Sequence, residues 1–526
     1  MTRPRVLVAD ELAEDGLNRL RAAADVAVRT KLPEAELVAA VGAYDALVVR
    51  SETTVTAAVL DAGSSLKVVG RAGVGVDNID VAAATRRGIL VVNAPRGNIV
   101  AAAEHTIGLL LALARNIPQA DAGVKRGEWQ RSRYTGVEVR GKMLGIIGLG
   151  NIGSEVAKRA QGLEMSVIAC DPAVASERAE QFHVELVNLD ELFQRADFIT
   201  VHAPLVDTTR NLIDARILAL AKPTARLVNA ARGGIVDEAA LYRALAEGRL
   251  AGAASDVFVN EPVGENPLLR LPNFVATPHI AASTVEAQTS VAFDVAEEVV
   301  AVLRGELPRW AVNAPSMAPE ELAFLRPFAL LAERLASLHV QLVDARVAQL
   351  EIDYWGDLAE RDVALVTASA IKGVFQPFTE ERINAVNARL VARNRGLRLV
   401  ERRIPADGGG YANRLTLRTD GHEVEGVVLA GEPRLIRVGP FGMDLVPEGR
   451  FLVSHHDDRP GVIGRIGTIL GENDINIASM HVGRDAPRGR AMMMLTVDEP
   501  VGDPVLNRLK GVYGMSDLRY VELGDI

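Results

Sequence analysis

The stretch MLGIIGLGNIG, residues 143–153, decides the fold class. An apolar run over 143–147 leads directly into a glycine-rich loop, and a helical pattern follows that loop. Gly148 allows a tight turn, Gly150 lets the backbone approach a pyrophosphate, and Gly153 lets the helix pack closely on the strand. The free N–H groups and the dipole of a helix N-terminus favour bound phosphates. Strand, loop and helix together predict a dinucleotide-binding α/β unit.

An acidic residue stands where such a unit would need one. Asp171 follows the next predicted strand, over 167–170. Its carboxylate can accept hydrogen bonds from an adenosine ribose, and its charge would repel a 2′-phosphate. We therefore expect NAD rather than NADP. The plain alternative is a strand-to-helix turn that binds nothing, but the agreement of loop, flanks and acidic residue favours the cofactor.

Short β-branched runs alternate with helical stretches on both sides of this loop. This alternation predicts two consecutive α/β domains, each with a doubly wound parallel sheet of Rossmann type. Between them, 101–115 is apolar nearly all round, as expected of a buried helix. The predicted strands are 6–9, 46–49, 66–70 and 89–92, then 144–147, 167–170, 198–201, 227–229 and 274–276, with helices that include 152–162, 238–247 and 284–303.

The remainder of the chain has a different pattern. Residues 304–319 are rich in Pro, Gly and Asn and read as a linker, after which 322–343 reads as a helix. The region up to about 449 predicts a mixed α+β domain. The last residues predict the order βαββαβ, a ferredoxin-like topology. Its elements are strand 451–454, helix 462–472, strands 476–482 and 491–497, helix 504–510 and strand 518–523.

Composition limits the function classes. The chain has 526 residues, 48% of them hydrophobic and 24% charged, which fits three or four globular domains. The formal net charge of −10 has the wrong sign for a protein whose whole surface binds nucleic acid or acidic lipid. We therefore expect neither a nucleic-acid partner nor a membrane partner.

The compartment is predicted from the cysteine and from the apolar segments. The single cysteine, Cys170, cannot form an intrachain disulfide, which fits a reducing compartment. The first residues run into the strand 6–9 without the apolar region and cleavage site of a signal peptide. The most apolar stretch, 107–114, is far shorter than the ~20 residues needed to cross a bilayer. We expect a cytoplasmic protein.

Three polar residues follow predicted strands downstream of the loop, where open α/β sheets bind ligands. Arg232 has the geometry to grip a substrate carboxylate in a bidentate pair. Glu261 and His279 follow the next runs, and a histidine held by a carboxylate suits proton exchange with an alcohol. Each has a plain alternative: a surface ion pair, a loop residue and a structural histidine. Spacing alone does not show that the three meet.

These motifs, in their order, resemble the D-isomer-specific 2-hydroxyacid dehydrogenases. The matching stretches are 148–153, Asp171, NAARGG at 229–234, DVF at 256–258 with Glu261-Pro262, and TPH at 277–279. Within that family, VRS at 49–51, RAGVGVDN at 71–78, AAEH at 102–105 and the C-terminal extension resemble the long-form phosphoglycerate dehydrogenases. The resemblance covers essentially the whole chain and is weakest over 320–449.

The resemblance implies NAD-dependent oxidation of 3-phospho-D-glycerate to 3-phosphohydroxypyruvate, the first step of the phosphorylated pathway of serine synthesis. Arg232 would be the substrate anchor, Glu261 the partner of the histidine, and His279 the proton donor and acceptor. The implied NAD-site residues are Gly148, Gly150, Asn151, Ile152, Gly153, Asp171, Ala203, Ala230, Ala231, Arg232, Asp256 and His279. The implied substrate residues are Arg50, Ser51, Arg71, Gly73, Val74, Asn78 and Arg232.

The expected domains follow from the same resemblance. They are a substrate-binding domain (1–97 and 287–313), an NAD-binding domain (98–286), an intervening domain (318–449) and a regulatory domain (450–526). Three residues depart from the usual family pattern: Ala281 replaces a common Gly, Ser255 a common Leu, and Val74 a Thr found in some relatives. None of these changes removes a reacting group.

The terminal unit resembles an ACT domain, a small amino-acid sensor. In the family such domains pair edge to edge across subunits and bind serine, the pathway end product, and the enzymes are homotetramers. His456, Asp458 and Asn476 match positions of the effector site. Asp458 would hold the effector's ammonium and Asn476 its side chain. The pair His455-His456 lacks the second cluster that a metal site needs, so we expect no metal.

Two other functions stay open at this point. The first is another D-2-hydroxyacid dehydrogenase, such as a hydroxypyruvate or glyoxylate reductase, against which the ACT-like tail and the cations Arg50 and Arg71 argue. The second is an NAD-sensing scaffold resembling a transcriptional corepressor. The retained Arg232, Glu261 and His279 argue for chemistry instead.

Overall fold

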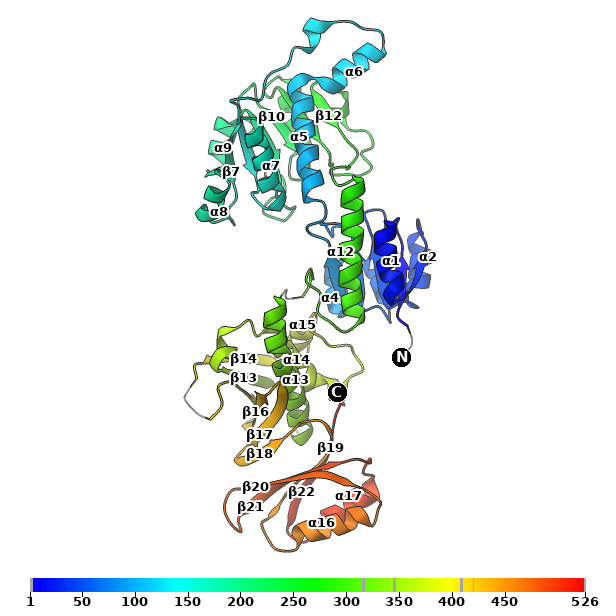
Figure 1. The fold of residues 1–526 in the computed structure, drawn as a ribbon, viewed down its shortest axis with the longest axis vertical. Coiled ribbons are helices and arrows are strands. Elements are labelled where there is room, and N and C mark those ends of the chain that lie inside the picture. The colour runs from blue at the N-terminus through cyan, green and yellow to red at the C-terminus, as the bar shows by residue number, and fades with distance from the viewer. Residues whose placement is uncertain (1–2, 315–316, 344–346, 407–409, 420, 525–526) are drawn as a thin grey trace.

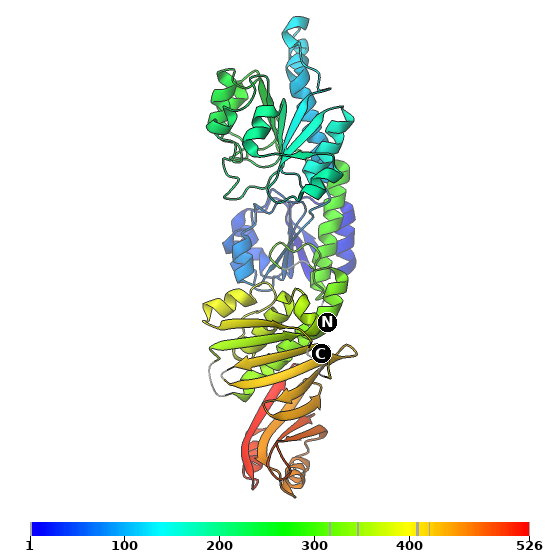
Figure 2. The same ribbon diagram turned by 90° about the vertical axis from the view of Figure 1, so that its left-hand side faces the viewer.

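The computed structural model describes residues 3–314, 317–343, 347–406, 410–419 and 421–524. These residues form four units, each built on its own sheet and arranged along one long axis (Figure 1). The second unit in sequence lies at one end, the first and third follow, and the C-terminal unit lies at the other end (Figure 2). The predicted order of two parallel-sheet units, a mixed-sheet unit and a ferredoxin-like unit is confirmed.

The first unit is a five-stranded parallel sheet in the order β2-β1-β3-β4-β5. Its strands are β1 (Arg5–Val8), β2 (Asp25–Val28), β3 (Ala46–Val49), β4 (Val68–Arg71) and β5 (Leu90–Asn93). Its helices are α1 (Glu14–Ala23), α2 (Glu34–Val41), α3 (Ala57–Ala62), α4 (Val81–Arg86) and α12 (Val285–Leu303). Separate apolar cores bury both faces of the sheet. Helix α12 returns to this unit from late in the sequence and runs beside α1 (Figure 1).

The second unit carries the glycine loop and has a seven-stranded parallel sheet in the order β12-β11-β10-β9-β6-β7-β8. Its strands are β6 (Met143–Ile147), β7 (Ser166–Cys170), β8 (Glu185–Leu186), β9 (Phe198–Val201), β10 (Arg226–Asn229), β11 (Gly252–Ser255) and β12 (Phe274–Ala276). Its helices are α5 (Ile99–Arg115), α6 (Ile117–Lys125), α7 (Asn151–Gly162), α8 (Ser176–Gln181), α9 (Leu189–Arg195), α10 (Ala215–Leu218) and α11 (Glu238–Ala246). Alternate residues of β9 enter different cores, Phe198 one and Ile199 the other, so both faces are covered.

Three strands of these sheets are missing from the sequence prediction. Strand β11 reads Gly-Ala-Ala-Ser and lacks the β-branched residues that mark a strand. Strand β2 is half exposed and contains an aspartate, and β8 has only two residues. Each is added to a sheet by pairing with a neighbour that the sequence does identify.

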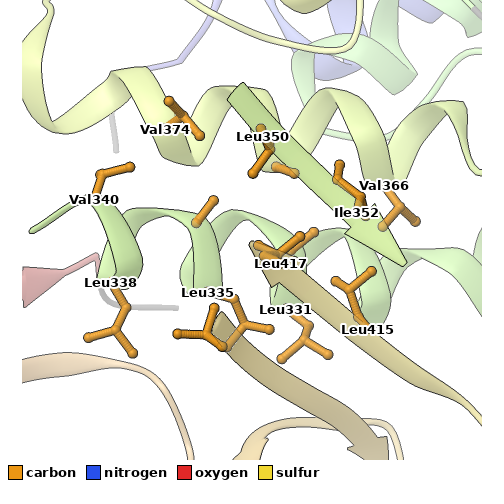
Figure 3. Packing of buried hydrophobic residues seen from close by; sticks show 14 of the residues in the cluster. Leu331, Leu335, Leu338, Val340, Leu350, Ile352, Val366, Val374, Leu415 and Leu417 are labelled. Atoms are coloured by element: carbon orange, nitrogen blue, oxygen red, sulfur yellow. The ribbon is translucent and has the colours of Figure 1, made fainter. Parts of the chain in front are cut away.

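The third unit has a six-stranded mixed sheet in the order β14-β13-β15-β16-β17-β18. Its strands are β13 (Gln349–Trp355), β14 (Arg398–Ile404), β15 (Arg414–Thr419), β16 (His422–Leu429), β17 (Glu432–Val438) and β18 (Phe441–Leu445), and its helices are α13 (Pro319–Leu342), α14 (Ala364–Phe375) and α15 (Ala388–Asn394). Helices α13 and α14 lie against the sheet. Leu335 on α13 and Leu417 on β15 are fully buried in the core between helix and sheet (Figure 3).

The segment expected to be a linker is partly bound to the first unit. Ala311 bridges Val92, and the N–H of Val312 donates to the carbonyl oxygen of Val91 at 2.7 Å. The third unit also contacts the first directly. The side chain of Arg382 donates to the carbonyl oxygen of Leu66, and that of Asn384 to the carbonyl oxygen of Gly88, each at 2.7 Å.

The C-terminal unit has the predicted βαββαβ order and an antiparallel sheet β20-β21-β19-β22. Its elements are β19 (Gly449–Asp457), α16 (Val462–Gly471), β20 (Ile477–Arg484), β21 (Arg490–Val497), α17 (Asp503–Lys510) and β22 (Met515–Leu523). Leu452 faces α16 and α17, whereas Phe451 and Val453 enter the core of the third unit. The two last units therefore share one apolar core.

The apolar helices of this fold can be compared with the length and composition that a membrane-crossing helix needs. Among the described residues, no one helix is both long and apolar enough to cross a membrane, although the bent pair α5 and α6 meets that length and composition together.

Replacement of Leu335 by Ala tests the core of the third unit. Because Leu335 is fully buried, we expect the change to cost about 2–5 kcal/mol of stability. Hydrogen exchange of the β13 and β15 amides, read by mass spectrometry, measures this loss locally. The control Leu429→Ala, at a side chain 41% exposed, should change exchange little. Equal protection in the two variants would contradict the assigned core.

Candidate active site

The residues predicted to act in chemistry lie at one edge of the second unit's sheet. Because all its strands are parallel, every loop that leaves a carboxyl end meets at that edge. The glycine loop follows β6, Asp171 follows β7, Ala203 follows β9 after one residue, and Ala230 and Ala231 follow β10. Asp256 follows β11, and His279 lies in the loop after β12. The strand order reverses between β9 and β6, which is where such sheets bind dinucleotides.

The glycine loop has the geometry of a phosphate cradle. Gly148 has φ of 93°, a left-handed conformation that favours glycine. A Cβ at Gly153 would lie 2.1 Å from the carbonyl oxygen of Gly148, so the first turn of α7 can only be this close without a side chain. A Cβ at Gly150 would meet no atom within 4 Å, so the space in front of this loop is open. These residues fit the pyrophosphate of a dinucleotide, with Asn151 and Ile152 beginning the helix.

Asp171 is placed to hold the loop and a ribose together. One carboxylate oxygen accepts the N–H of Leu149 at 2.8 Å, and the other accepts the N–H of Ala173 at 2.9 Å. Each oxygen keeps a free lone pair for a ribose hydroxyl. The side chain is therefore fixed before any ribose arrives.

Asp256 organises the loop that carries His279. Its carboxylate is completely buried and accepts the Thr277 hydroxyl at 2.6 Å and two backbone N–H groups, of Ile280 and Ala281, at 2.9 Å each. The His105 ring on α5 lies 3.3 Å away. Burial alone raises the pKa of Asp256, but these hydrogen bonds outweigh it and hold the pKa below its ordinary value. The carboxylate thus holds the chain on both sides of His279, through the Thr277 hydroxyl before it and two backbone N–H groups after it.

His279 and Glu261 form a hydrogen-bonded pair. The Nδ1 of His279 lies 2.7 Å from Oε2 of Glu261, while Oε1 of Glu261 accepts the N–H of Phe258 at 2.9 Å. His279 has φ of 55° and its backbone N–H donates to the carbonyl oxygen of Asp256. The carboxylate selects the tautomer with a proton on Nδ1, which leaves Nε2 free to accept a proton. The imidazole is 43% exposed, so a ligand can reach it.

Arg232 lies on the same edge and reaches the first unit. Its Nε donates to Asp77 Oδ2 at 2.8 Å and its Nη1 to the carbonyl oxygen of Ala231 at 2.7 Å. The side chain of Asn229 donates to the Arg232 carbonyl oxygen and accepts the N–H of Ala231, which fixes the turn. A carboxyl-end loop of one sheet thus contacts a carboxyl-end loop of the other, and we call the region where these loops meet the crevice.

The first unit contributes two further guanidinium groups to this crevice. Arg50 follows β3, and Arg71 ends β4. Arg71 is largely buried, and among the described residues its Nε has no hydrogen-bond partner. Burial and the neighbouring charge of Arg232 lower the pKa of Arg71 to about 10, so it stays charged at neutral pH. A buried guanidinium nitrogen without a hydrogen-bond partner among the described residues indicates a place for an anion.

The other predicted substrate residues have different surroundings. The amide of Asn78 donates to the carbonyl oxygens of Arg50 and Thr53, at 2.7 and 2.6 Å, so it orders the Arg50 loop. The side-chain amide of Asn93 donates a hydrogen bond to the backbone carbonyl oxygen of Val74. Gly73, at φ of 149°, leaves room for the Arg71 guanidinium. Ser51 is exposed beside Arg50. Asn78 and the Val74 carbonyl therefore help to order these loops, and the substrate contacts of both residues stay a prediction.

The departures from the family pattern are accommodated by the fold. Ala281 is buried, and its backbone N–H serves Asp256. The hydroxyl of Ser255 donates to the carbonyl oxygen of Val257 at 2.7 Å. Neither disturbs the His279–Glu261 pair.

Two functional carboxylates were missed as candidates. The loop sequence 71–78 assigns no role to Asp77, although its carboxylate accepts a hydrogen bond from Arg232. Asp10 accepts the N–H of Arg50 at 2.5 Å and the hydroxyl of Thr53, so it shapes the Arg50 loop. Asp10 directly follows a buried strand, as the recognised site residues do, and that position was the available signal.

The three residues expected at the effector site do not meet within one chain. Asp458 accepts the N–H of Arg488 and the side chain of Arg484 at one end of the C-terminal sheet. Asn476 donates to Asp498 at the opposite end. His456 is buried on the helix side of β19, whereas His455 faces the third unit, so the two rings point to opposite faces.

Family models match three regions of the chain. The D-isomer specific 2-hydroxyacid dehydrogenase NAD binding domain matches residues 107–281. The D-3-phosphoglycerate dehydrogenase intervening domain matches 324–439, and the ACT domain matches 450–512.

Relatives match over nearly the whole length. The D-3-phosphoglycerate dehydrogenase of Synechocystis is 46% identical and that of Methanocaldococcus jannaschii 45% identical. Each alignment covers 99% of this chain, with 95% and 100% of the relative. A crystal structure of D-lactate dehydrogenase from Aquifex aeolicus, complexed with NAD and lactic acid, is 28% identical with a TM-score of 0.53. It covers 59% of this chain and 100% of its own.

Replacement of Asp171 by Ala tests cofactor choice. Hydrogen bonds to a charged group contribute about 1.5–3 kcal/mol, so the KM for NAD should rise about tenfold or more. The KM for NADP should not rise in parallel, because the charge that repels its 2′-phosphate is gone. Steady-state kinetics with both cofactors measure the ratio. A parallel loss with NAD and NADP would show that Asp171 only supports the loop.

Proposed function

The chain belongs to the D-3-phosphoglycerate dehydrogenases of the D-isomer-specific 2-hydroxyacid dehydrogenase family, and from this we propose that it oxidises 3-phospho-D-glycerate to 3-phosphohydroxypyruvate with NAD. The observation that carries the choice of substrate is the crevice itself. It combines a proton acceptor on one unit with the cations Arg50, Arg71 and Arg232 around it. A substrate with both a carboxylate and a phosphate satisfies such a cluster.

His279 is assigned the proton transfer. With Nδ1 held by Glu261, Nε2 accepts the proton of the C2 hydroxyl as the C–O bond becomes a carbonyl. Glu261 then stabilises the imidazolium that results. Bound NAD supplies the acceptor for the hydride that leaves C2. In the reverse direction the same imidazolium returns the proton to the carbonyl oxygen.

Arg232 is assigned the substrate carboxylate and the developing carbonyl. Its Nε and Nη1 are fixed by Asp77 and Ala231, so Nη2 remains to bind the substrate. Orientation of the carboxylate directs the single C2 hydrogen toward the cofactor and the C2 hydroxyl toward His279. Arg71 and Arg50 on the opposite wall are assigned the phosphate, which gives Arg71 its missing partner.

We also propose that L-serine regulates the enzyme through the C-terminal unit. Strand β20 is an edge strand, and its Met480 and Val482 are 45% and 39% exposed. Pairing of two such edges about a two-fold axis would bring Asn476 of one subunit to the Asp458 end of the other. A small amino acid could then be held by groups from both. This arrangement supports a homotetramer, with further contacts elsewhere completing the closed symmetry.

A cytoplasmic location is part of the same proposal. The free thiol of Cys170 fits a reducing compartment. The substrate and the cofactor are small soluble metabolites.

Replacement of His279 by Ala tests the reaction. We expect kcat for NADH consumption with 3-phosphohydroxypyruvate to fall about 10²–10⁴-fold, because the proton donor is lost. The control His183→Ala removes another exposed histidine with positive φ from the same unit, far from the crevice, and should keep full turnover. Turnover of hydroxypyruvate or glyoxylate but not of the phosphorylated acid would overturn the substrate assignment. No turnover of any 2-hydroxy or 2-oxo acid by the folded wild type would favour a scaffold.

Mixed subunits test the effector site. Asp458→Ala and Asn476→Ala should each raise the serine concentration for half inhibition about tenfold, since each removes a hydrogen bond to the effector. If each site takes Asp458 from one subunit and Asn476 from the other, reassembly of the two variants together restores some intact sites and some sensitivity. Asn473→Ala, on the same unit, is the control. Wild-type activity that serine does not affect would remove the feedback proposal and leave the enzyme assignment standing.

A further inference from the structure

Asp77 occupies an unusual place for an acidic residue. It lies in the loop after β4 of the first unit, and its carboxylate crosses the crevice to the Nε of Arg232 on the second unit at 2.8 Å. Its side chain is 67% exposed, whereas that of Arg232 is 29% exposed. An acid thus stands among three guanidinium groups that are assigned to hold an anionic substrate.

The contact fixes the rotation of the Arg232 guanidinium. Nε is held by Asp77 and Nη1 by the carbonyl oxygen of Ala231, so two of its three nitrogens are committed. Nη2 lies over Gly75, where a Cβ would be 1.9 Å from it and 2.9 Å from the Asp77 carboxylate. Gly75 therefore leaves the room that this pair needs. The two N–H groups of Nη2 and the second N–H of Nη1 remain, at a defined place, to meet the substrate.

The charge of Asp77 acts on the same cluster. Asp77 and Asp10 are the carboxylates that favour the charged form of Arg71, while Arg232 and Arg50 oppose it. Asp10 is buried and its oxygens accept the N–H groups of Arg50 and Thr53. Asp77 is the more exposed of the two acids and faces the space where the substrate's charges must come.

We propose that Asp77 is a positioning residue for Arg232 and that its negative charge limits how tightly the crevice holds anionic substrate and product. The inference rests on the proposed function. Its hydrogen bond aligns Nη2 with the reacting carboxylate and carbonyl, which favours turnover. Its charge repels the phosphate and carboxylate of the ground state, so a multiply charged product is released rather than trapped. Position and charge are separable effects of one side chain.

Two substitutions separate these effects. Asp77→Asn keeps an oxygen that accepts from Nε and removes the charge, so KM for 3-phospho-D-glycerate should fall about 3–10-fold while kcat stays within about twofold. Asp77→Ala removes both, so kcat should fall about 10–100-fold because Arg232 is free to rotate. The matched control is Asp61→Asn, since Asp61 pairs with an arginine Nε at the same 2.8 Å on the same unit and is similarly exposed, away from the crevice. It should leave both constants unchanged.

Calorimetric titration with inorganic phosphate gives a readout independent of turnover. Asp77→Asn should bind phosphate more tightly than the wild type by a similar factor, and the gain should shrink in high salt. The proposal is overturned if Asn and Ala variants share the same kcat, or if the Asn variant binds phosphate no better than the wild type. A wild type that binds phosphate but does not oxidise 3-phospho-D-glycerate would remove the proposed function alone, and the titration would still decide the role of the charge.

Discussion

The common direction of the strands in two parallel sheets is the constraint on which this protein depends. The loop that follows the carboxyl end of each strand lies at the same edge of its sheet. The shared strand direction is therefore enough to place residues that follow six strands of the second unit at one edge. Strand direction does not fix the conformation of the loop that carries His279, but the hydrogen bonds of the buried Asp256 carboxylate do. Once its charge is out of water it must be met by donors, and the backbone around His279 provides two of them. The backbone conformation at His279 thus follows from the hydrogen bonds that the buried Asp256 carboxylate requires.

The crevice divides the chemistry between two bodies. The proposed proton transfer takes place on the second unit, where Glu261 and His279 form a hydrogen-bonded pair. The proposed recognition of the phosphate takes place on the first unit, through Arg50 and Arg71. Arg232 joins them, since it is anchored on one unit and paired with Asp77 on the other. Substrate therefore meets a complete site only when both walls are in place.

A continuous set of contacts leads from the C-terminal unit to the recognition wall. The C-terminal sheet shares an apolar core with the third unit, and the third unit donates hydrogen bonds from Arg382 and Asn384 to the backbone of the first. These three units are packed in succession (Figure 2). In the proposed regulation by serine, these contacts connect the effector's unit to the wall that carries Arg50 and Arg71.

The sequence by itself determined what is local. The strand, glycine loop and helix at 143–153 predict the dinucleotide unit, and β-branched runs predict most strands. Arg232 and His279 are identified because each follows a predicted strand, and Glu261 because it follows the run 256–260. Strand β11, which has no β-branched residue, is a strand because it pairs with β10 and β12 in the sheet. The tertiary structure alone decided which distant residues meet: Asp77 reaches Arg232, Asn78 turns to the backbone, and Asp458 and Asn476 lie at opposite ends of one sheet. The hydrophobic periodicity of the sequence indicates which residues of each element are buried. Which charged residues meet depends on how separate elements pack together in the fold.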